Sequence, residues 1–222
     1  HVFEFLPVEE LKNHFEEIMS AGYSVSLFTD WQQDAVNEVW VKSVVSEGIV
    51  KEMPAVFFGG KAAKGNMHPI ASISSENCTE QMGVPGPWHE RLPHFKMGFT
   101  PSSGKELQSE YFVPFENGFA AFQAIAALGK DIGPHLFISE IRSIAADNLW
   151  MSIAHQRKSI SLHSTWKQEQ QAVEALMPRI EKALEPFSPR PHWGKLFTVP
   201  SSARADADPQ MEAFRTCAEK HD

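Results

Sequence analysis

The chain has 222 residues, with 28 acidic and 20 basic side chains, a net charge of −8, 42% hydrophobic residues and 22% charged residues. This composition is typical of a globular domain and excludes a disordered chain. The acidic balance argues against a nucleic-acid partner, and no apolar run approaches the ~20 residues that cross a bilayer. Cys78 and Cys217 lie far apart without CxxC spacing, so we expect neither a disulfide framework nor a structural zinc site. We therefore expect a reduced, cytoplasmic protein, and the start at His1 without an initiator methionine suggests a fragment of a longer chain.

The first hundred residues predict one helix, two strands and a long connection. Residues 7–21 carry apolar side chains at helical spacing, with a proline in the first turn and Gly22 as a stop. Residues 23–29 and 38–45 alternate and are rich in β-forming side chains, which predicts two strands. Residues 46–105 are rich in Gly, Pro, Ser and Asn but also contain Trp, Phe and Met. We expect this stretch to be an ordered excursion that packs on another surface.

The second half of the chain predicts four strands and two helices. The strands are residues 107–113, 136–143, 159–166 and 195–199, and the helices are residues 117–128 and 167–184. Pro178 inside the last helix is expected to kink or split it. The order β-α-β-β-α-β is that of the split βαβ, ferredoxin-like unit. The predicted fold class is therefore α+β, an antiparallel sheet with flanking helices and a long ordered insertion.

Polar side chains interrupt two of these strands. Strand alternation puts Glu140 and Arg142 on one face of a largely apolar strand, where a carboxylate and a guanidinium have to be paired or face a cavity. In the following strand, Ser161, His163 and Thr165 share a face. If these strands are antiparallel neighbours, one sheet face gathers donors and acceptors that suit a polyhydroxylated ligand. The alternative is a buried ion pair beside a hydrogen-bonded core histidine.

A third polar cluster follows the last helix, in the run Arg190-Pro191-His192-Trp193-Gly194-Lys195. Trp193 supplies an aromatic wall, Gly194 allows a close backbone approach, and Lys195 supplies a cation. The alternative is a Pro/Gly turn with a surface lysine.

Several common catalytic motifs are absent from the sequence, namely GxGxxG, the phosphate loop and GxSxG. The run from His89 to His94 looks briefly like a metalloprotease motif, but its histidines are five residues apart and Pro93 prevents a helix between them. We therefore expect no metal site there.

Together, the three polar clusters resemble the C-terminal half of bacterial alditol oxidases (xylitol or sorbitol oxidases). These enzymes form part of the aldonolactone-oxidase branch of the vanillyl-alcohol-oxidase flavoprotein superfamily. Each piece alone is weak, but the combination is specific, and the similarity extends from the first helix to about Val199. The segments that carry it are Ser139-Glu140-Ile141-Arg142, Leu162-His163-Ser164-Thr165-Trp166, His192-Trp193-Gly194-Lys195, Asn77-Cys78-Thr79-Glu80-Gln81, Gly86-Pro87-Trp88-His89-Glu90-Arg91-Leu92-Pro93-His94-Phe95 and Glu110-Tyr111.

The resemblance implies a two-domain oxidase. Its N-terminal half binds FAD, commonly through a covalent histidine link, and its C-terminal half is a cap over the flavin ring that forms the substrate pocket. Residues 1–222 then correspond to the substrate-binding cap domain alone, with the FAD domain of the same protein as its partner. We expect the isolated chain to be colourless and inactive. We also expect an exposed apolar patch at the aromatic-rich residues 88–99, where the FAD domain would dock.

By the same resemblance, the side chains that bind substrate hydroxyls are Glu140, Arg142, Thr165 and, in support of them, His163. Lys195 lies by the reacting carbon and the flavin, and His192 contacts FAD. The implied reaction oxidises the primary alcohol of an alditol to the aldose, with hydride transfer to FAD and reduction of O2 to H2O2. Lys195 and Arg142 near the developing alkoxide would lower the barrier electrostatically.

Two alternatives stay open. An aldonolactone oxidase or dehydrogenase, such as a D-arabinono-1,4-lactone oxidase, would use the same polar groups on a sugar lactone. A ferredoxin-like sugar-binding or interaction domain without catalysis is the alternative from a different class. An upstream flavin-binding domain favours either enzyme, and turnover of open-chain polyols or of a lactone distinguishes the two.

Overall fold

The computed structural model describes residues 1–50, 52–100, 106–200 and 210–221. The strands are β1 (Val2–Pro7), β2 (Ser24–Thr29), β3 (Ala35–Lys42), β4 (Val56–Phe57), β5 (Gly60–Ala62), β6 (Leu107–Pro114), β7 (Leu136–Ile144), β8 (Ser159–Trp166) and β9 (Arg190–Pro191). The α-helices are α1 (Val8–Asn13), α2 (Phe15–Met19), α3 (Trp88–Arg91), α4 (Gly118–Ala126), α5 (Gly129–Ile132), α6 (Gln170–Leu184) and α8 (Met211–His221). The 3-10 helices are η1 (Ser75–Asn77), η2 (Phe115–Asn117), η3 (Gly133–His135) and η4 (Glu185–Phe187).

In the part of the chain that the structure describes, these strands form one nine-stranded antiparallel sheet in the order β4-β5-β1-β3-β2-β7-β8-β6-β9. The sheet contains two units of similar topology. The first has the chain order β1-α1-α2-β2-β3 and the sheet order β1-β3-β2. The second is β6-α4-β7-β8-α6-β9, with the sheet order β9-β6-β8-β7. The antiparallel sheet with flanking helices confirms the predicted α+β class.

The beginning of the chain differs from the prediction because it is a strand. β1 pairs with β3 along its length, and the sequence offers no turn signal between this strand and the helix that follows directly. The helix predicted over residues 7–21 is also divided at His14, whose φ of −131° and ψ of 27° separate α1 from α2. Leu11, Ile18 and Met19 are nevertheless buried, so the predicted apolar stripe still faces the core.

The prediction of a strand over residues 195–199 is wrong. The last strand of the sheet is β9, which pairs with β6 over two residues. Pro191 has no N–H to donate, and a turn follows at Gly194, so the ladder ends early. The chain still follows β6 for a short distance, since His192 N donates to Glu110 O at 2.9 Å. This contact holds the turn beside the centre of β6.

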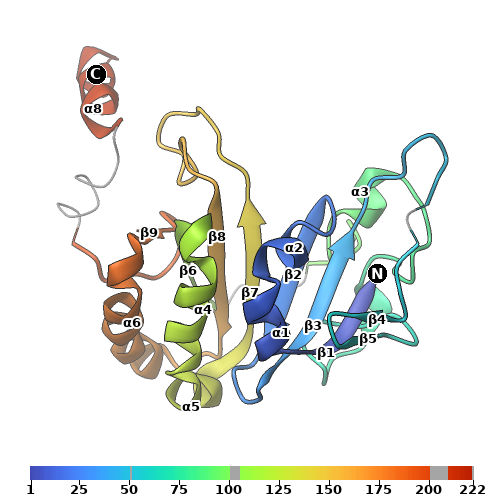
Figure 1. The fold of residues 1–222 in the computed structure, drawn as a ribbon. Helices are drawn as coiled ribbons and strands as arrows, with labels where there is room; N and C mark the ends of the chain where they lie inside the picture. Colours follow the sequence, from blue (N-terminus) through green and yellow to red (C-terminus); the bar gives the residue numbers. More distant parts are fainter. Residues whose placement is uncertain (51, 101–105, 201–209, 222) are drawn as a thin grey trace.

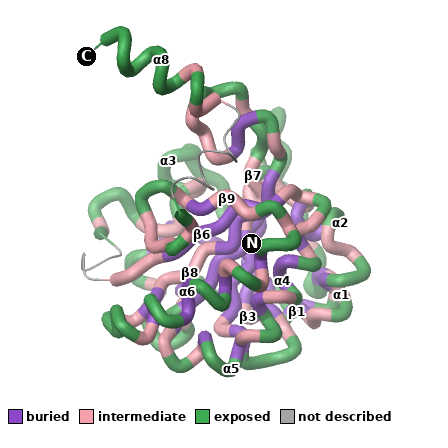
Figure 2. The backbone as a smooth tube through the Cα atoms, turned by 90° about the vertical axis from the view of Figure 1, so that its left-hand side faces the viewer, coloured by how far each residue is buried: buried purple, intermediate pink, exposed green. Residues whose placement is uncertain are grey.

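The main core lies between one face of the sheet and the helices α1, α2, α4, α5 and α6 (Figure 1). Figure 2 shows the buried residues concentrated along the central strands, and the core joins β1–β3 to β6–β8 without a break. α6 runs through Pro178 without splitting, because the apolar side chains on both sides of it, among them Val173, Met177 and Ile180, are buried in this core.

The predicted insertion is ordered where it is described, and it packs on the opposite face of the sheet. A second apolar cluster joins it to β1, β2, β3 and β7 through Val2, Phe28, Trp40, Ala63, Cys78 and Ile138, with Met67, Ile70 and Phe95 packed against it. The last residues of the predicted stretch, 101–105, lie outside the described residues. On the same face, β6, β7 and β8 carry the polar side chains singled out by the sequence.

Candidate functional site

The polar face is built by the register of three neighbouring strands. β7 and β8 are antiparallel neighbours, as predicted, and Glu140 lies opposite His163 while Arg142 lies opposite Ser161. β6 pairs with the other edge of β8 and brings Glu110 opposite His163. Because residues two apart point to the same side of a strand, these side chains share the face opposite the main core.

A carboxylate that the sequence analysis did not place in the site is the centre of this cluster. Glu110 Oε1 lies 2.7 Å from Arg142 Nη2 and also accepts a hydrogen bond from the Ser161 hydroxyl. Glu110 Oε2 accepts from Lys195 Nζ at 2.7 Å. The side chain of Glu110 is only 3% exposed. Burial by itself would raise its pKa, but the charge of Arg142 and the hydrogen bonds of Lys195 and Ser161 outweigh burial and lower the pKa of Glu110 to about 2.

Arg142 has two carboxylate partners, and its contact with Glu140 is longer than its contact with Glu110. Glu140 Oε1 lies 3.8 Å from Arg142 Nε, which is an ion pair without a hydrogen bond. Glu140 has two further partners, His94, whose Nε2 lies 2.9 Å from Oε1, and the side chain of Ser26. Burial would raise the pKa of Glu140, but the hydrogen bond of His94 and the charge of Arg142 lower it to about 2. Glu140 therefore stays ionised at neutral pH.

His163 and Thr165 lie on β8 beside this charge cluster. His163 Nε2 is 3.3 Å from Gln108 Oε1, and burial together with the charge of Lys195 lowers the pKa of His163 to about 4. The imidazole is therefore neutral at neutral pH. Thr165 is half-buried, two residues further along the same face, and lies opposite Gln108 in the register.

The turn after β9 brings the third predicted cluster to the same place. Lys195 reaches Glu110 from this turn, and Lys195 N donates to His192 O at 3.2 Å. His192 Nδ1 accepts from Gly194 N at 3.1 Å, and its ring lies against Phe112 with centroids 6.4 Å apart. The structure therefore brings together Glu140, Arg142, His163 and Lys195, with Thr165 and His192 on the margins.

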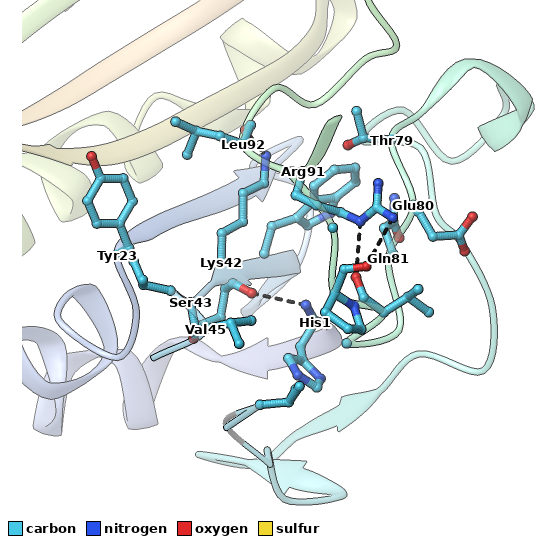
Figure 3. A pocket seen from close by; sticks show the side chains of 18 of the residues that line it. His1, Tyr23, Lys42, Ser43, Val45, Thr79, Glu80, Gln81, Arg91 and Leu92 are labelled. Carbon is cyan, nitrogen blue, oxygen red and sulfur yellow. Dashed lines mark hydrogen bonds between the residues drawn. The ribbon is translucent and has the colours of Figure 1, made fainter. Parts of the chain in front are cut away.

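A cavity of about 670 Å³ lies at the end of β3 (Figure 3). Its lining includes Tyr23, Val45, Trp88 and Arg91, whereas none of the predicted site residues lines it. Lys42 belongs to both regions. Its side chain lines the cavity and extends toward Leu92, where Nζ also lies 3.0 Å from His94 Nδ1. The polar cluster is a better candidate for the chemistry than the cavity, because its buried carboxylate holds two cations in direct contact.

Three residues that contact the cluster were absent from the site predicted by sequence: Glu110, His94 and Lys42. Strand alternation in residues 107–113 offered a signal for Glu110, which is the single carboxylate in that strand. His94 lies in an irregular stretch, and Lys42 ends a strand, so neither carries a local pattern that points to the site. Their contacts arise from the insertion folding back over the sheet.

Within the described ranges, the His, Cys, Asp and Glu side chains form no group of three that could hold a metal ion. Over the same ranges, no helix has the length and apolar character required to cross a membrane.

Trp88 and Met97 are strongly exposed, whereas Phe95 packs on the sheet, so the predicted apolar patch is present only in part.

Comparison with known proteins identifies the family. A family model described as D-arabinono-1,4-lactone oxidase matches residues 99–222, more than half of the chain. The chain belongs to this family. The match includes β6 to β9 and every site residue predicted from the sequence, whereas Lys42 and His94 precede it.

Two curated relatives extend the comparison. Alditol oxidase from a Streptomyces species is 43% identical over 222 residues, which is 100% of this chain and 52% of that protein. L-gulono-1,4-lactone dehydrogenase from Mycobacterium tuberculosis is 27% identical over 131 residues, which is 58% of this chain and 30% of that protein. This member of the D-arabinono-1,4-lactone oxidase family thus spans about half the length, or less, of these relatives.

Proposed function

We propose that residues 1–222 form the substrate-binding cap of an FAD-dependent oxidoreductase. The proposed reaction oxidises the primary alcohol of an alditol, such as xylitol or sorbitol, to the aldose. The 43% identity to an alditol oxidase along the whole chain supports this reading. The proposed partners are the polyol and an FAD-binding domain of the same protein. The cytoplasmic location stays a prediction from cysteine usage.

The observation that carries the proposal is the pair of cations held around one buried carboxylate. Glu110 fixes Arg142 and Lys195 on the same face, with both charge-assisted hydrogen bonds at 2.7 Å. An ammonium has three N–H groups, and the bond to Glu110 uses one of them, so Lys195 retains donors for an oxygen of a ligand. Arg142 Nε is buried and makes no hydrogen bond to any described residue. The remaining N–H groups of Lys195 suit a hydroxyl that develops negative charge, whereas the buried Nε of Arg142 is out of reach of a ligand.

The reacting alcohol loses a hydride from carbon and a proton from oxygen. Lys195 and Arg142 would stabilise the negative charge on that oxygen, which lowers the barrier because both groups are already oriented. Glu140, Arg142 and Thr165 would bind the other hydroxyls. His163 is neutral at neutral pH, so its imidazole both donates and accepts hydrogen bonds, which suits a supporting role beside hydroxyl groups.

The residues at the turn after β9 fit a flavin as neighbour. His192 Nδ1 is committed to Gly194 N, which leaves Nε2 for a ligand, and Lys195 supplies further donors for the acceptor atoms of a flavin ring. FAD, when bound, supplies the two-electron acceptor, with O2 as the final acceptor and H2O2 as its product. The contribution of this chain is to bind and orient the polyol.

A lactone substrate is the second candidate. The description of the family model and the lactone dehydrogenase relative both favour it, and a sugar lactone presents hydroxyls that the same polar face could bind. A sugar-binding domain without catalysis is the remaining alternative, and it predicts binding of a polyol without turnover.

The test is peroxide release by the full-length flavoprotein on xylitol, sorbitol and an aldono-1,4-lactone. We expect peroxide from the open-chain polyols, and we expect Lys195→Met to reduce kcat by about a hundredfold, as loss of one oriented donor does elsewhere. Lys167→Met is the matched control, because Lys167 donates to a backbone carbonyl, that of Pro134, away from this cluster. Turnover of the lactone alone would move the protein to the second candidate, and Lys195→Met with full activity would remove Lys195 from the reaction.

A further inference from the structure

A line of polar contacts runs from the end of β3 to Glu140. Lys42 Nζ donates to Leu92 O and lies 3.0 Å from His94 Nδ1. On the other side of the ring, His94 Nε2 lies 2.9 Å from Glu140 Oε1. The three side chains come from β3, from the insertion and from β7, and they are 46 or more residues apart in sequence.

The chemistry of Lys42 decides which nitrogen of His94 carries the proton. An ammonium has donors only, so Nδ1 has to accept the hydrogen bond from Lys42. The ring proton of the neutral imidazole then resides on Nε2, where it is donated to the Glu140 carboxylate. The other tautomer would set two donors against each other at Nδ1 and two acceptors against each other at Nε2. Burial lowers the pKa of Lys42 to about 8, so the ammonium form still predominates at pH 7.

Packing holds the imidazole in this orientation. The ring of His94 stands edge-on to Trp40, with centroids 5.1 Å apart and an angle of 89°, and edge-on to Phe28 at 5.5 Å. The backbone is fixed as well, since Thr79 N donates to His94 O at 3.0 Å. The ring therefore has little freedom to turn, and its orientation is transmitted to the carboxylate of Glu140.

We propose that Lys42 and His94 are positioning residues for Glu140. Lys42 selects the tautomer of His94, and His94 holds the Glu140 carboxylate in the orientation that accepts a substrate hydroxyl. This inference rests on the proposed function, in which Glu140 binds the polyol. It also gives the insertion a role in the site, because the insertion contributes the imidazole.

The kinetic test uses the full-length flavoprotein and a double-mutant cycle. We expect His94→Leu and Lys42→Met to reduce kcat/KM for the polyol by about 10- to 100-fold, the usual cost of losing a group that orients a site residue. His94→Gln retains a donor toward Glu140 and should recover most of the loss. In a Glu140→Gln background, His94→Leu should have little further effect, because the carboxylate that it orients is gone.

Two matched controls come from a similar arrangement elsewhere. His135 pairs with Glu169, and Lys167 donates to the carbonyl of Pro134, as Lys42 does to Leu92. His135 and Lys167 flank the Leu136–Trp166 pair, where β7 begins and β8 ends, and neither contacts Glu140 or His94. His135→Leu and Lys167→Met should leave kcat/KM unchanged. Equal kcat/KM in wild type and His94→Leu, or additive losses in the cycle, would overturn the proposal.

A second measurement does not depend on turnover. Nitrogen-15 spectra of the histidine-labelled protein should show His94 protonated on Nε2 in the wild type and as a mixture of tautomers in Lys42→Met. A proton on Nδ1 in the wild type would refute the role of Lys42. If the wild type oxidises no polyol or lactone, the proposed function fails, and the spectra then decide the pairing of Lys42 with His94 separately.

Discussion

Replacing Glu110 by Gln tests the electrostatic centre of the site. Glu110 accepts from Arg142, Ser161 and Lys195, and it is almost fully buried. An amide at this position keeps the shape but removes the charge, and its NH2 group meets a cationic donor on one side. We therefore expect the folded state to lose stability, because two cations are left close together without their anion.

The magnitude follows from the pKa of Glu110, which falls from 4.5 to about 2. At about 1.4 kcal/mol per pH unit, this corresponds to about 3 kcal/mol of stability at neutral pH. Loss of one partner of a buried ion pair costs about 3–5 kcal/mol in other proteins, which agrees with the value worked from the pKa of Glu110. The folded pKa is lowered, so the contribution is complete above pH 4.5 and is lost as the pH falls through about 2.

Urea unfolding of wild type and Glu110→Gln between pH 7 and pH 3 measures this contribution. We expect a difference of about 3 kcal/mol in the free energy of unfolding at pH 7, which shrinks below pH 4.5. Glu174→Gln, which changes an exposed carboxylate on α6, is the control and should show a small difference at every pH. A difference under 1 kcal/mol at pH 7, or one that stays constant down to pH 3, would refute the reasoning.

Three further predictions concern the sheet and its helices. Burial raises the pKa of Glu38 from 4.5 to about 7. The free energy of unfolding contributed by this group therefore falls as the pH rises from 4.5 to 7. Glu38→Gln should raise the urea midpoint at about pH 8 but not at pH 4.5. A lower midpoint at pH 8 would contradict this. A Cβ on Gly129 would lie 2.5 Å from Trp31 O, so Gly129→Ala should cost about 1–3 kcal/mol, and an unchanged Tm would refute the clash. Tyr111 donates to Glu181 at 2.8 Å, and Glu181 also accepts from Thr198, so Tyr111→Phe should cost about 1–3 kcal/mol in urea unfolding, and an unchanged midpoint would refute a stabilising role of the Tyr111 hydroxyl.

Local pattern was sufficient for much of the fold. β2, β6, β7, β8, α4 and α6 were predicted within a few residues, because alternation and helical spacing reflect which side of each element is buried. The same alternation placed Glu140 and Arg142 on one face and His163 on its neighbour, and the register agrees. The final strand was predicted over residues 195–199 because the residues after Lys195 are apolar, whereas the ladder ends at Pro191 and a turn follows at Gly194.

The amino-acid order determined which side chains share a face of each strand, because side-chain direction repeats every two residues whatever the strand lies beside. It did not determine that Glu110 serves both Arg142 and Lys195, or that Lys42 meets Glu140 through His94. Those contacts join residues 32 to 85 positions apart, and they depend on the strand order β2-β7-β8-β6 and on the path of the insertion. Strand order and loop path are set by packing of the whole core, so tertiary structure alone decided the charge network of the site.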